Sequence, residues 1–299
     1  MSQEQRDTLD QMIRNGPLDV GGDPQEQRAT YERMLTAQPL PGDVVTTPGK
    51  LGGIATVAID VDGVESADVI LWFHGGFYIV GSTATSAVLA SSVARRARTR
   101  VVGVDYRLAP EHPYPAALED ALAAYRGLLD SGVPASRIAF VGESAGAGLV
   151  MATLVALKSA SLPQPSAAVV LSPYVDLTLS GASITKKAAV DPAFAPEGVR
   201  RWAALYVDDG DAQDSLISPL FADLTGLPPL LIQVGSHEIL LDDATRLATS
   251  AAAADVAVTL DVTPGVPHVF QAFAAVLDEG EAAVTRIASF LSSHLSPED

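Results

Sequence analysis

The sequence predicts an α/β protein with a mostly parallel sheet and helices on both faces of that sheet. Runs rich in β-forming residues recur along the chain, at 54–61, 68–73, 100–106, 137–142, 167–172, 229–235 and 256–263. Several of these runs are continuously apolar, as strands buried on both faces are. Segments of helical length, rich in Ala and Leu, lie between most of them. Such alternation is typical of βα units in a parallel sheet.

Two further helices are expected before the first strand, at 3–15 and 25–37, where apolar residues recur at helical spacing. The helices between the strands are predicted at 85–97, 115–129, 145–159, 242–254 and 281–295. Residues 176–218 break the alternation, because about forty residues separate two buried strands without a strand signal of their own. We interpret this segment as an inserted helical excursion.

Composition favours one large globular domain of 299 residues, since 48% of the residues are hydrophobic and only 18% are charged. The formal net charge of −17 repels phosphate backbones and anionic lipids, so we expect no nucleic-acid partner. With no cysteine, the chain has no thiolate chemistry and no cysteine-ligated metal. A homodimer is compatible with these properties.

No membrane span is expected. The longest stretch without Asp, Glu, Lys or Arg, residues 69–94, is interrupted by His74-Gly75-Gly76 and by Gly81-Ser82-Thr83. The charged N-terminal residues are not followed by an apolar signal core, so we expect a cytoplasmic protein.

The pentapeptide Gly142-Glu143-Ser144-Ala145-Gly146 carries the strongest chemical signal. It follows a β-like run and precedes a helical run, which is the strand-turn-helix context that a G-x-S-x-G nucleophile motif requires. A helix-capping serine in a glycine-rich turn would share the pentapeptide but would have no partner motifs. Ser144 is therefore the candidate nucleophile.

A second motif, His74-Gly75-Gly76, directly follows the β-run at 68–73. A loop with few side chains at this point can aim backbone N–H groups at a developing oxyanion. Gly75 and Gly76 are the candidate donors from this loop. Ala145, at the start of the helix after the nucleophile, would supply a further N–H.

Residues 105–116, between these motifs, read Asp-Tyr-Arg-Leu-Ala-Pro-Glu-His-Pro-Tyr-Pro-Ala. With this block and both motifs, the chain resembles the bacterial hormone-sensitive-lipase-like branch of the α/β-hydrolase esterases from His74 to His268. The resemblance implies an α/β-hydrolase fold with an eight-stranded sheet. It also implies cap helices at 1–40 and a catalytic domain at 41–299, with the excursion at 176–218 completing the cap.

One position departs from the family pattern, because members often carry a third glycine where this chain has Phe77. A backbone donor survives this change. The resemblance leaves open which of Gly75, Gly76 and Phe77 donate to the oxyanion. Tyr106, Arg107 and Glu111, in the block at 105–116, are interpreted as a structural ion pair and hydrogen-bond set.

Chain order selects the general base, since the acid and then the histidine follow the serine in this architecture. His268 meets this condition in a Pro- and Gly-rich loop after the last β-run. The loop after the run at 229–235 offers three acids, Glu238, Asp242 and Asp243. The resemblance favours Glu238, where aspartate is the commoner choice.

These residues predict acyl transfer through a serine ester, with no cofactor and no metal. We expect uncharged esters of short or medium acyl chain, because the cap segments bring apolar side chains and no basic cluster. The apolar residues are Met12, Ile13, Met34, Leu35, Phe194, Trp202, Leu205 and Tyr206. Lactones also fit, since the motifs resemble monoterpene lactone hydrolases. A non-catalytic ligand receptor and an amidase are the alternatives on the same fold.

Overall fold

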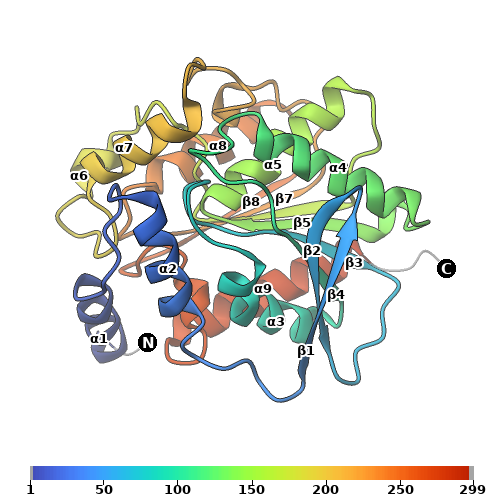
Figure 1. The fold of residues 1–299 in the computed structure, drawn as a ribbon, viewed down its shortest axis with the longest axis horizontal. Coiled ribbons are helices and arrows are strands. Elements are labelled where there is room, and N and C mark those ends of the chain that lie inside the picture. The colour runs from blue at the N-terminus through green and yellow to red at the C-terminus, as the bar shows by residue number, and fades with distance from the viewer. Residues whose placement is uncertain (1–2, 296–299) are drawn as a thin grey trace.

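The computed structural model describes residues 3–295 and contains one eight-stranded sheet (Figure 1). The strand order is β1-β2-β4-β3-β5-β6-β7-β8, and every pair from β4 to β8 is parallel. The strands are β1 Val44–Leu51, β2 Ile54–Val61, β3 Val69–Phe73, β4 Arg100–Val104, β5 Ile138–Glu143, β6 Ala167–Leu171, β7 Leu230–Gly235 and β8 Val258–Thr263. The mostly parallel eight-stranded sheet is therefore confirmed.

Strand β1 is the one strand of this sheet that the sequence runs did not indicate. It pairs antiparallel with β2 at the sheet edge, and all but its two end residues are exposed. Pro48 and Gly49 lie inside it, and both residues argue against a strand when the sequence is read alone. The β1–β2 turn packs closely against the chain at Ala123, since a Cβ on Gly52 would lie 2.0 Å from the carbonyl oxygen of that residue.

Continuously apolar strands arise here because alternate side chains enter two different cores. Leu71 and Phe73 of β3 belong to the core on one face of the sheet, whereas Ile70 and Trp72 belong to the core on the other. Helices α4, α5 and α8 cover the first face, and α3 and α9 cover the second. These helices are α3 Thr83–Ala97, α4 Ala116–Asp130, α5 Ala145–Ser159, α8 Leu241–Ala253 and α9 Asp278–His294.

The segment at 176–218 is helical, as expected, with α6 Ser183–Lys186 and α7 Pro196–Val207. It lies on the same side of the molecule as α1 Gln3–Arg14 and α2 Pro24–Leu35 (Figure 1). The two segments contact each other directly: the indole N–H of Trp202 donates to the carbonyl of Gly22 at 3.0 Å, and Arg201 donates to that of Gly21. Within residues 3–295, no helix is both long and apolar enough to cross a bilayer.

Candidate active site

Ser144 lies in a strained turn between β5 and α5. Its backbone has φ 56° and ψ −119°, a conformation that L-residues rarely adopt. The flanking glycines make the turn possible, because a Cβ on Gly146 would lie 1.9 Å from the carbonyl oxygen of Phe73 and one on Gly142 would lie 2.4 Å from that of Gly146. The turn thus has the geometry that the G-x-S-x-G context predicts.

His268 and Glu238 form a buried pair. Nδ1 of His268 lies 2.5 Å from Oε2 of Glu238, whose side chain is completely buried. The other oxygen of Glu238 accepts hydrogen bonds from the N–H of Gly235 at 2.7 Å and from the hydroxyl of Ser172 at 2.9 Å. With these partners, the carboxylate is held in one orientation toward the imidazole.

Ser172 connects this pair to the strand end beside the nucleophile. The sequence alone did not identify Ser172 as a functional residue. Its hydroxyl also accepts from the N–H of Val269, which follows His268, at 3.0 Å. The preceding residue, Leu171, accepts from the N–H of Ser144 at 2.8 Å. The available signal was a polar residue at the carboxyl end of a buried strand, where ligand-facing groups of parallel sheets gather.

The second ring nitrogen of His268, Nε2, is buried and makes no hydrogen bond within residues 3–295. Ser144 is itself only 4% exposed. An imidazole oriented through Nδ1 by a carboxylate, with Nε2 free, can accept a proton from a nucleophile or from water.

The loop after β3 lies against the nucleophile, since a Cβ on Gly75 would lie 3.2 Å from the Cβ of Ser144. The N–H of Gly75, however, donates to Oε1 of Glu143 at 3.0 Å. The expectation that Gly75 is an oxyanion donor is therefore revised, because its hydrogen is already engaged. In the described part of the chain, the N–H groups of Gly76 and Phe77 donate no hydrogen bond.

Ala145 begins α5 directly after the nucleophile. The first N–H groups of a helix have no acceptor within the helix, and the dipole favours negative charge at this end. The N–H of Ala145 therefore lies at the helix N-terminus, as expected for an oxyanion donor.

His74 has a structural environment. Its ring stacks on Tyr106 with 4.1 Å between centroids, and the Tyr106 hydroxyl donates to the carbonyl of His74 at 2.7 Å. Burial lowers the pKa of His74 to about 4, so the ring is neutral near pH 7. These contacts support the backbone of the loop that carries Gly75 and Gly76.

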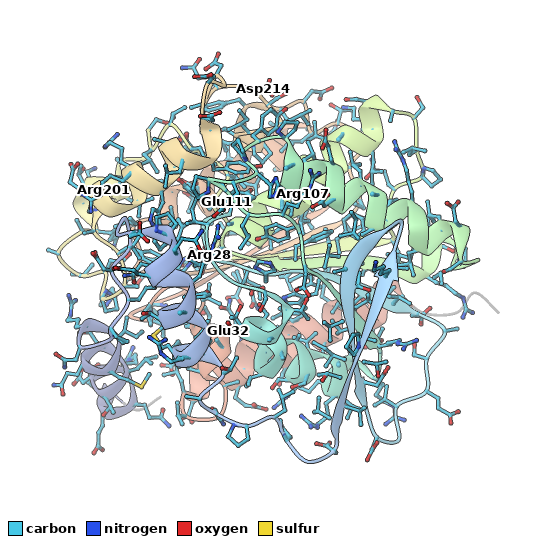
Figure 2. All side chains as sticks on the ribbon, in the orientation of Figure 1. Arg28, Glu32, Arg107, Glu111, Arg201 and Asp214 are labelled. Atoms are coloured by element: carbon cyan, nitrogen blue, oxygen red, sulfur yellow. The ribbon has the colours of Figure 1, made fainter. Side chains whose placement is uncertain are left out.

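The expected ion pairs of the 105–116 block form with other partners. Arg107 binds Asp120 and Glu119 of α4, at 2.8 and 3.0 Å. Glu111 binds Arg28 of α2 at 2.6 Å (Figure 2). The three residues have structural contacts, but the expected ion pair within the block does not form, because α2, which is distant in sequence, supplies the cation for Glu111.

The other two candidate acids bind elsewhere. Asp242 accepts from the N–H of Ser183 at 2.9 Å, and Asp243 accepts from the N–H groups of Val175 and Asp176, both at 3.0 Å. Each attaches the start of α8 to a neighbouring segment. Of the three acids, the structure brings Glu238 to His268.

A series of aromatic contacts leads from His268 to Trp202 of α7. Phe194 lies against the imidazole at 4.7 Å between centroids, and Phe77 contacts Phe194 at 4.9 Å and Trp202 at 5.6 Å. Two of the apolar residues expected in the cap lie outward instead, since Met12 is 54% and Met34 37% exposed.

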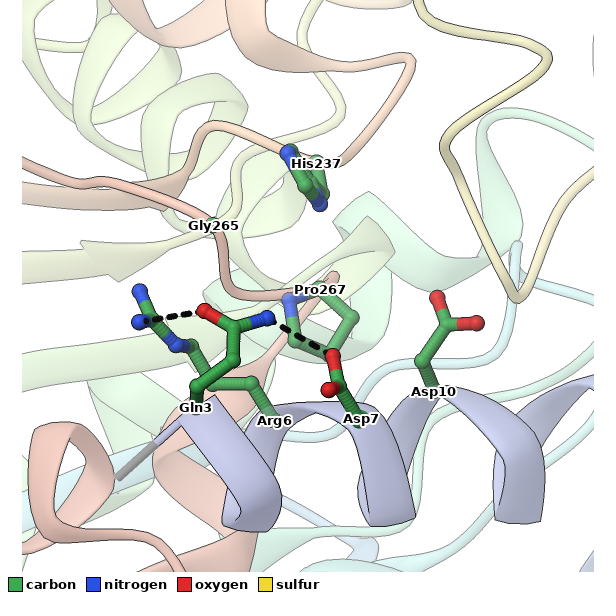
Figure 3. A pocket seen from close by; sticks show the side chains of 7 residues that line it. All are labelled: Gln3, Arg6, Asp7, Asp10, His237, Gly265 and Pro267. Carbon is green, nitrogen blue, oxygen red and sulfur yellow. Dashed lines mark hydrogen bonds between the residues drawn. The ribbon is translucent and has the colours of Figure 1, made fainter. Parts of the chain in front are cut away.

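A pocket of about 180 Å³ lies between α1 and the loop that carries His268 (Figure 3). It is lined by Gln3, Arg6, Asp7, Asp10, His237, Gly265 and Pro267. None of Ser144, Glu238 and His268 lines it. In residues 3–295, no three His, Cys, Asp or Glu side chains are arranged to hold a metal.

Comparisons with known proteins agree with this arrangement. A family model described as an alpha/beta hydrolase fold matches residues 70–272. An acetyl-hydrolase from Streptomyces hygroscopicus is 41% identical over 274 residues, which cover 90% of this chain and 90% of that protein. An esterase from Acinetobacter venetianus is 36% identical over 271 residues, which cover 90% of this chain and 89% of that protein.

Among solved structures, a crystal structure of an esterase from the bacterial hormone-sensitive lipase family shares 45% sequence identity with this chain. The TM-score is 0.95, and the match covers 99% of this chain and 100% of the other. Fold, length and sequence agree over nearly the whole chain, so the protein belongs to the hormone-sensitive-lipase-like branch of the α/β-hydrolase family and is a carboxylesterase.

Proposed function

We propose that ester hydrolysis proceeds through an acyl-enzyme on Ser144, with His268 as general base and Glu238 as the acid that orients it. His268 removes the proton of the serine hydroxyl, which attacks the ester carbonyl, and then gives a proton to the leaving alcohol. Water, activated by the same imidazole, releases the acid. The observation that carries the assignment is the buried 2.5 Å contact between Glu238 and His268, joined through Ser172 to the strand end beside Ser144.

The proposed oxyanion donors are the N–H groups of Gly76, Phe77 and Ala145. The first two make no other hydrogen bond among the described residues, and the third begins a helix. Removing one such donor costs about 10²- to 10³-fold in turnover in other serine hydrolases. The mechanism requires no cofactor.

The proposed substrates are uncharged esters with acyl groups at the short end of the short-to-medium range, with lactones as a further class. Phe77 and Phe194 support a short acyl group, because their rings lie between the catalytic histidine and the cap helix α7. The acetyl-hydrolase among the relatives is in line with this limit.

We also propose that residues 1–40 and 176–218 act together as the cap over this site. The hydrogen bonds from Trp202 and Arg201 to the segment between α1 and α2 support a joint cap. A cytoplasmic location is a further proposal, for which the absence of cysteine is weak support.

Labelling with an organophosphate, together with the Ser144→Ala variant, tests the mechanism. We expect one labelled serine, Ser144, and a loss of turnover of about a millionfold in the variant, by analogy with serine protease mutants. The melting temperature of the variant should stay close to that of the wild type. Label on another serine, or an active Ser144→Ala variant, would contradict the assignment.

A panel of esters of increasing acyl length, with a lactone and an acetamide, tests the substrate class. Wild type is expected to prefer the shortest esters to the acetamide. In Phe77→Ala, loss of the ring should raise the ratio of kcat/KM for a long ester to that for an acetyl ester by about 10-fold or more, because one methylene in an apolar pocket is worth about 1–3 kcal/mol. An unchanged ratio would show that Phe77 does not limit acyl length.

A further inference from the structure

We propose that Glu143 is a positioning residue that holds the loop after β3, residues 74–77 and here called the oxyanion loop, against the nucleophile. This inference rests on the proposed function of Ser144. Glu143 is the last residue of β5 and immediately precedes Ser144, and its side chain is buried. Its hydrogen bonds go to the loop after β3 and to α3, so its proposed role is to act through the loop that it binds.

The carboxylate joins three elements. Its Oε1 accepts from the N–H of Gly75 at 3.0 Å and from the hydroxyl of Ser86 on α3. Strands β3 and β5 are parallel neighbours in register at Phe73 and Gly142, so the loop after β3 and the residue before the nucleophile meet at the same sheet edge. Glu143 thereby connects the nucleophile strand to the oxyanion loop.

The bond to Gly75 has a direct consequence for its neighbours. Because Gly75 is held through its N–H, the peptide groups that follow it, those of Gly76 and Phe77, start from a fixed orientation. Both residues have left-handed backbones, with φ 114° and 58°, which a free loop would not favour for phenylalanine. The side chain of Glu143 therefore restrains the two N–H groups proposed for the oxyanion.

Stability alone does not explain a carboxyl group at this position. Burial raises the pKa of Glu143 to about 7, and no cation contributes to holding it ionised. The indole N–H of Trp72 lowers that pKa, yet Oε2 makes no hydrogen bond of normal geometry in residues 3–295. A buried carboxylate with one unpaired oxygen costs stability, and apolar replacements of buried charges are often neutral or stabilising. Its contribution is accordingly expected in turnover.

The effect should appear in kcat rather than in KM, because the oxyanion exists only in the transition state. A displacement of catalytic groups by about 1 Å can cost about 10²-fold. We therefore expect Glu143→Ala to lower kcat by about 10²-fold, with KM changed by less than about threefold. Glu143→Gln, whose amide oxygen can accept the same two hydrogen bonds, should restore most of the lost turnover.

The experiment measures kcat and KM on an acetyl ester, with competent sites counted by organophosphate titration and folding followed by the melting temperature. Ser86→Ala provides a milder variant, which removes one donor to Oε1 and keeps the bond from Gly75. We expect it to lower kcat per competent site by less than Glu143→Ala. Glu279→Gln is the matched control, since Glu279 is also a buried carboxyl, 3% exposed, and lies at the start of α9.

Each outcome decides the inference. Lower turnover per competent site in Glu143→Ala, recovery in Glu143→Gln and wild-type turnover in Glu279→Gln support it. Unchanged turnover per site with a lower melting temperature in Glu143→Ala would overturn it in favour of a purely structural role. If Glu143→Ala does not fold, wild-type turnover per competent site in Ser86→Ala would overturn it. Labelling of a serine other than Ser144 would instead overturn the proposed function.

Discussion

The Ser172 hydroxyl shows how few atoms hold the proposed triad together. It donates to Glu238 and accepts from the N–H next to His268, so one side chain orients both the acid and the loop of the base. The acid has a second donor in Gly235. Because a buried carboxylate needs each of these partners, small changes here should affect catalysis before they affect the fold.

The three neighbouring acids can be separated by amide substitution. Glu238→Gln keeps the shape of the side chain but favours the wrong imidazole tautomer, so turnover should fall by about ten-thousandfold. Asp242→Asn should retain turnover and lose about 1 kcal/mol or less of stability, since within residues 3–295 its carboxylate accepts only from the N–H of Ser183. Turnover and melting temperature are measured for both variants. An inactive Asp242→Asn beside an active Glu238→Gln would identify Asp242 as the acid.

The raised pKa of Asp243 leads to a specific prediction for how stability depends on pH. Its folded pKa is raised to about 7, chiefly by burial and then by the charge of Asp176. The neutral form of Asp243 therefore favours the folded state. Its contribution to the free energy of unfolding is fully present below about pH 4 and is lost as pH rises through about 7. Between about pH 5 and pH 8, the melting temperature of wild type should fall relative to that of Asp243→Asn. A constant gap between the two proteins would show that this carboxyl titrates at its ordinary pKa.

At the scale of elements, α1 and α2 attach to the site more than to the sheet. No residue of α2 is buried, and Arg28 anchors it to the carbonyls of Ile79 and Ala109, both at 2.8 Å, and to Glu111. The one buried residue of α1, Leu9, packs with Val266 and Phe270 on either side of His268. The two helices thus contact the loops that carry the catalytic groups.

Deleting residues 1–38 should therefore impair activity far more than folding. We expect lower turnover on all esters, the largest loss on medium-chain esters, and more aggregation from the exposed apolar surface. Activity across acyl lengths, circular dichroism and light scattering measure these effects. In the full-length chain, Leu9→Ala is the matched control, which should lower turnover without changing the ratio between chain lengths. An unchanged chain-length profile in the truncated protein would exclude these helices from the pocket.

At the scale of the molecule, the parallel sheet brings the ends of β3, β5, β6 and β7 to one edge, and every proposed catalytic group follows one of these strands or the adjacent β8. Strand β8 is the last strand on one side of the sheet and pairs only with β7. Two of its apolar side chains are exposed, Leu260 by 38% and Val262 by 41%. An edge strand with apolar side chains favours pairing with a second chain.

We propose a homodimer through this edge. Light scattering after gel filtration should give twice the mass of the 31.0 kDa chain. Val262→Lys should shift the protein toward monomer, because a charge on an edge strand opposes pairing. Thr249→Lys, on the exposed part of α8, is the control and should keep the dimer. A monomeric wild type at micromolar concentration would contradict the proposal.

The strand-turn-helix at Ser144, the alternation of the parallel sheet and the helix at 145–159 could all be predicted from local pattern, because each depends on residues that are close along the chain. Chain order, together with the Pro- and Gly-rich loop after the last β-run, also singled out His268. Only the tertiary structure distinguished Glu238 from Asp242 and Asp243 by contact, since their distances to His268 depend on how β7 and β8 pack.

The same dependence on packing explains what the sequence did not reveal. The hydrogen bond from Gly75 to Glu143, the bridge made by Ser172 and the pairing of Glu111 with Arg28 all join residues more than sixty positions apart. Strand β1 also depends on a partner, because it is held by pairing with β2 and not by its own burial. Local pattern identified the reactive groups, and the contacts between distant segments decided which of their hydrogen-bonding atoms stay free to react.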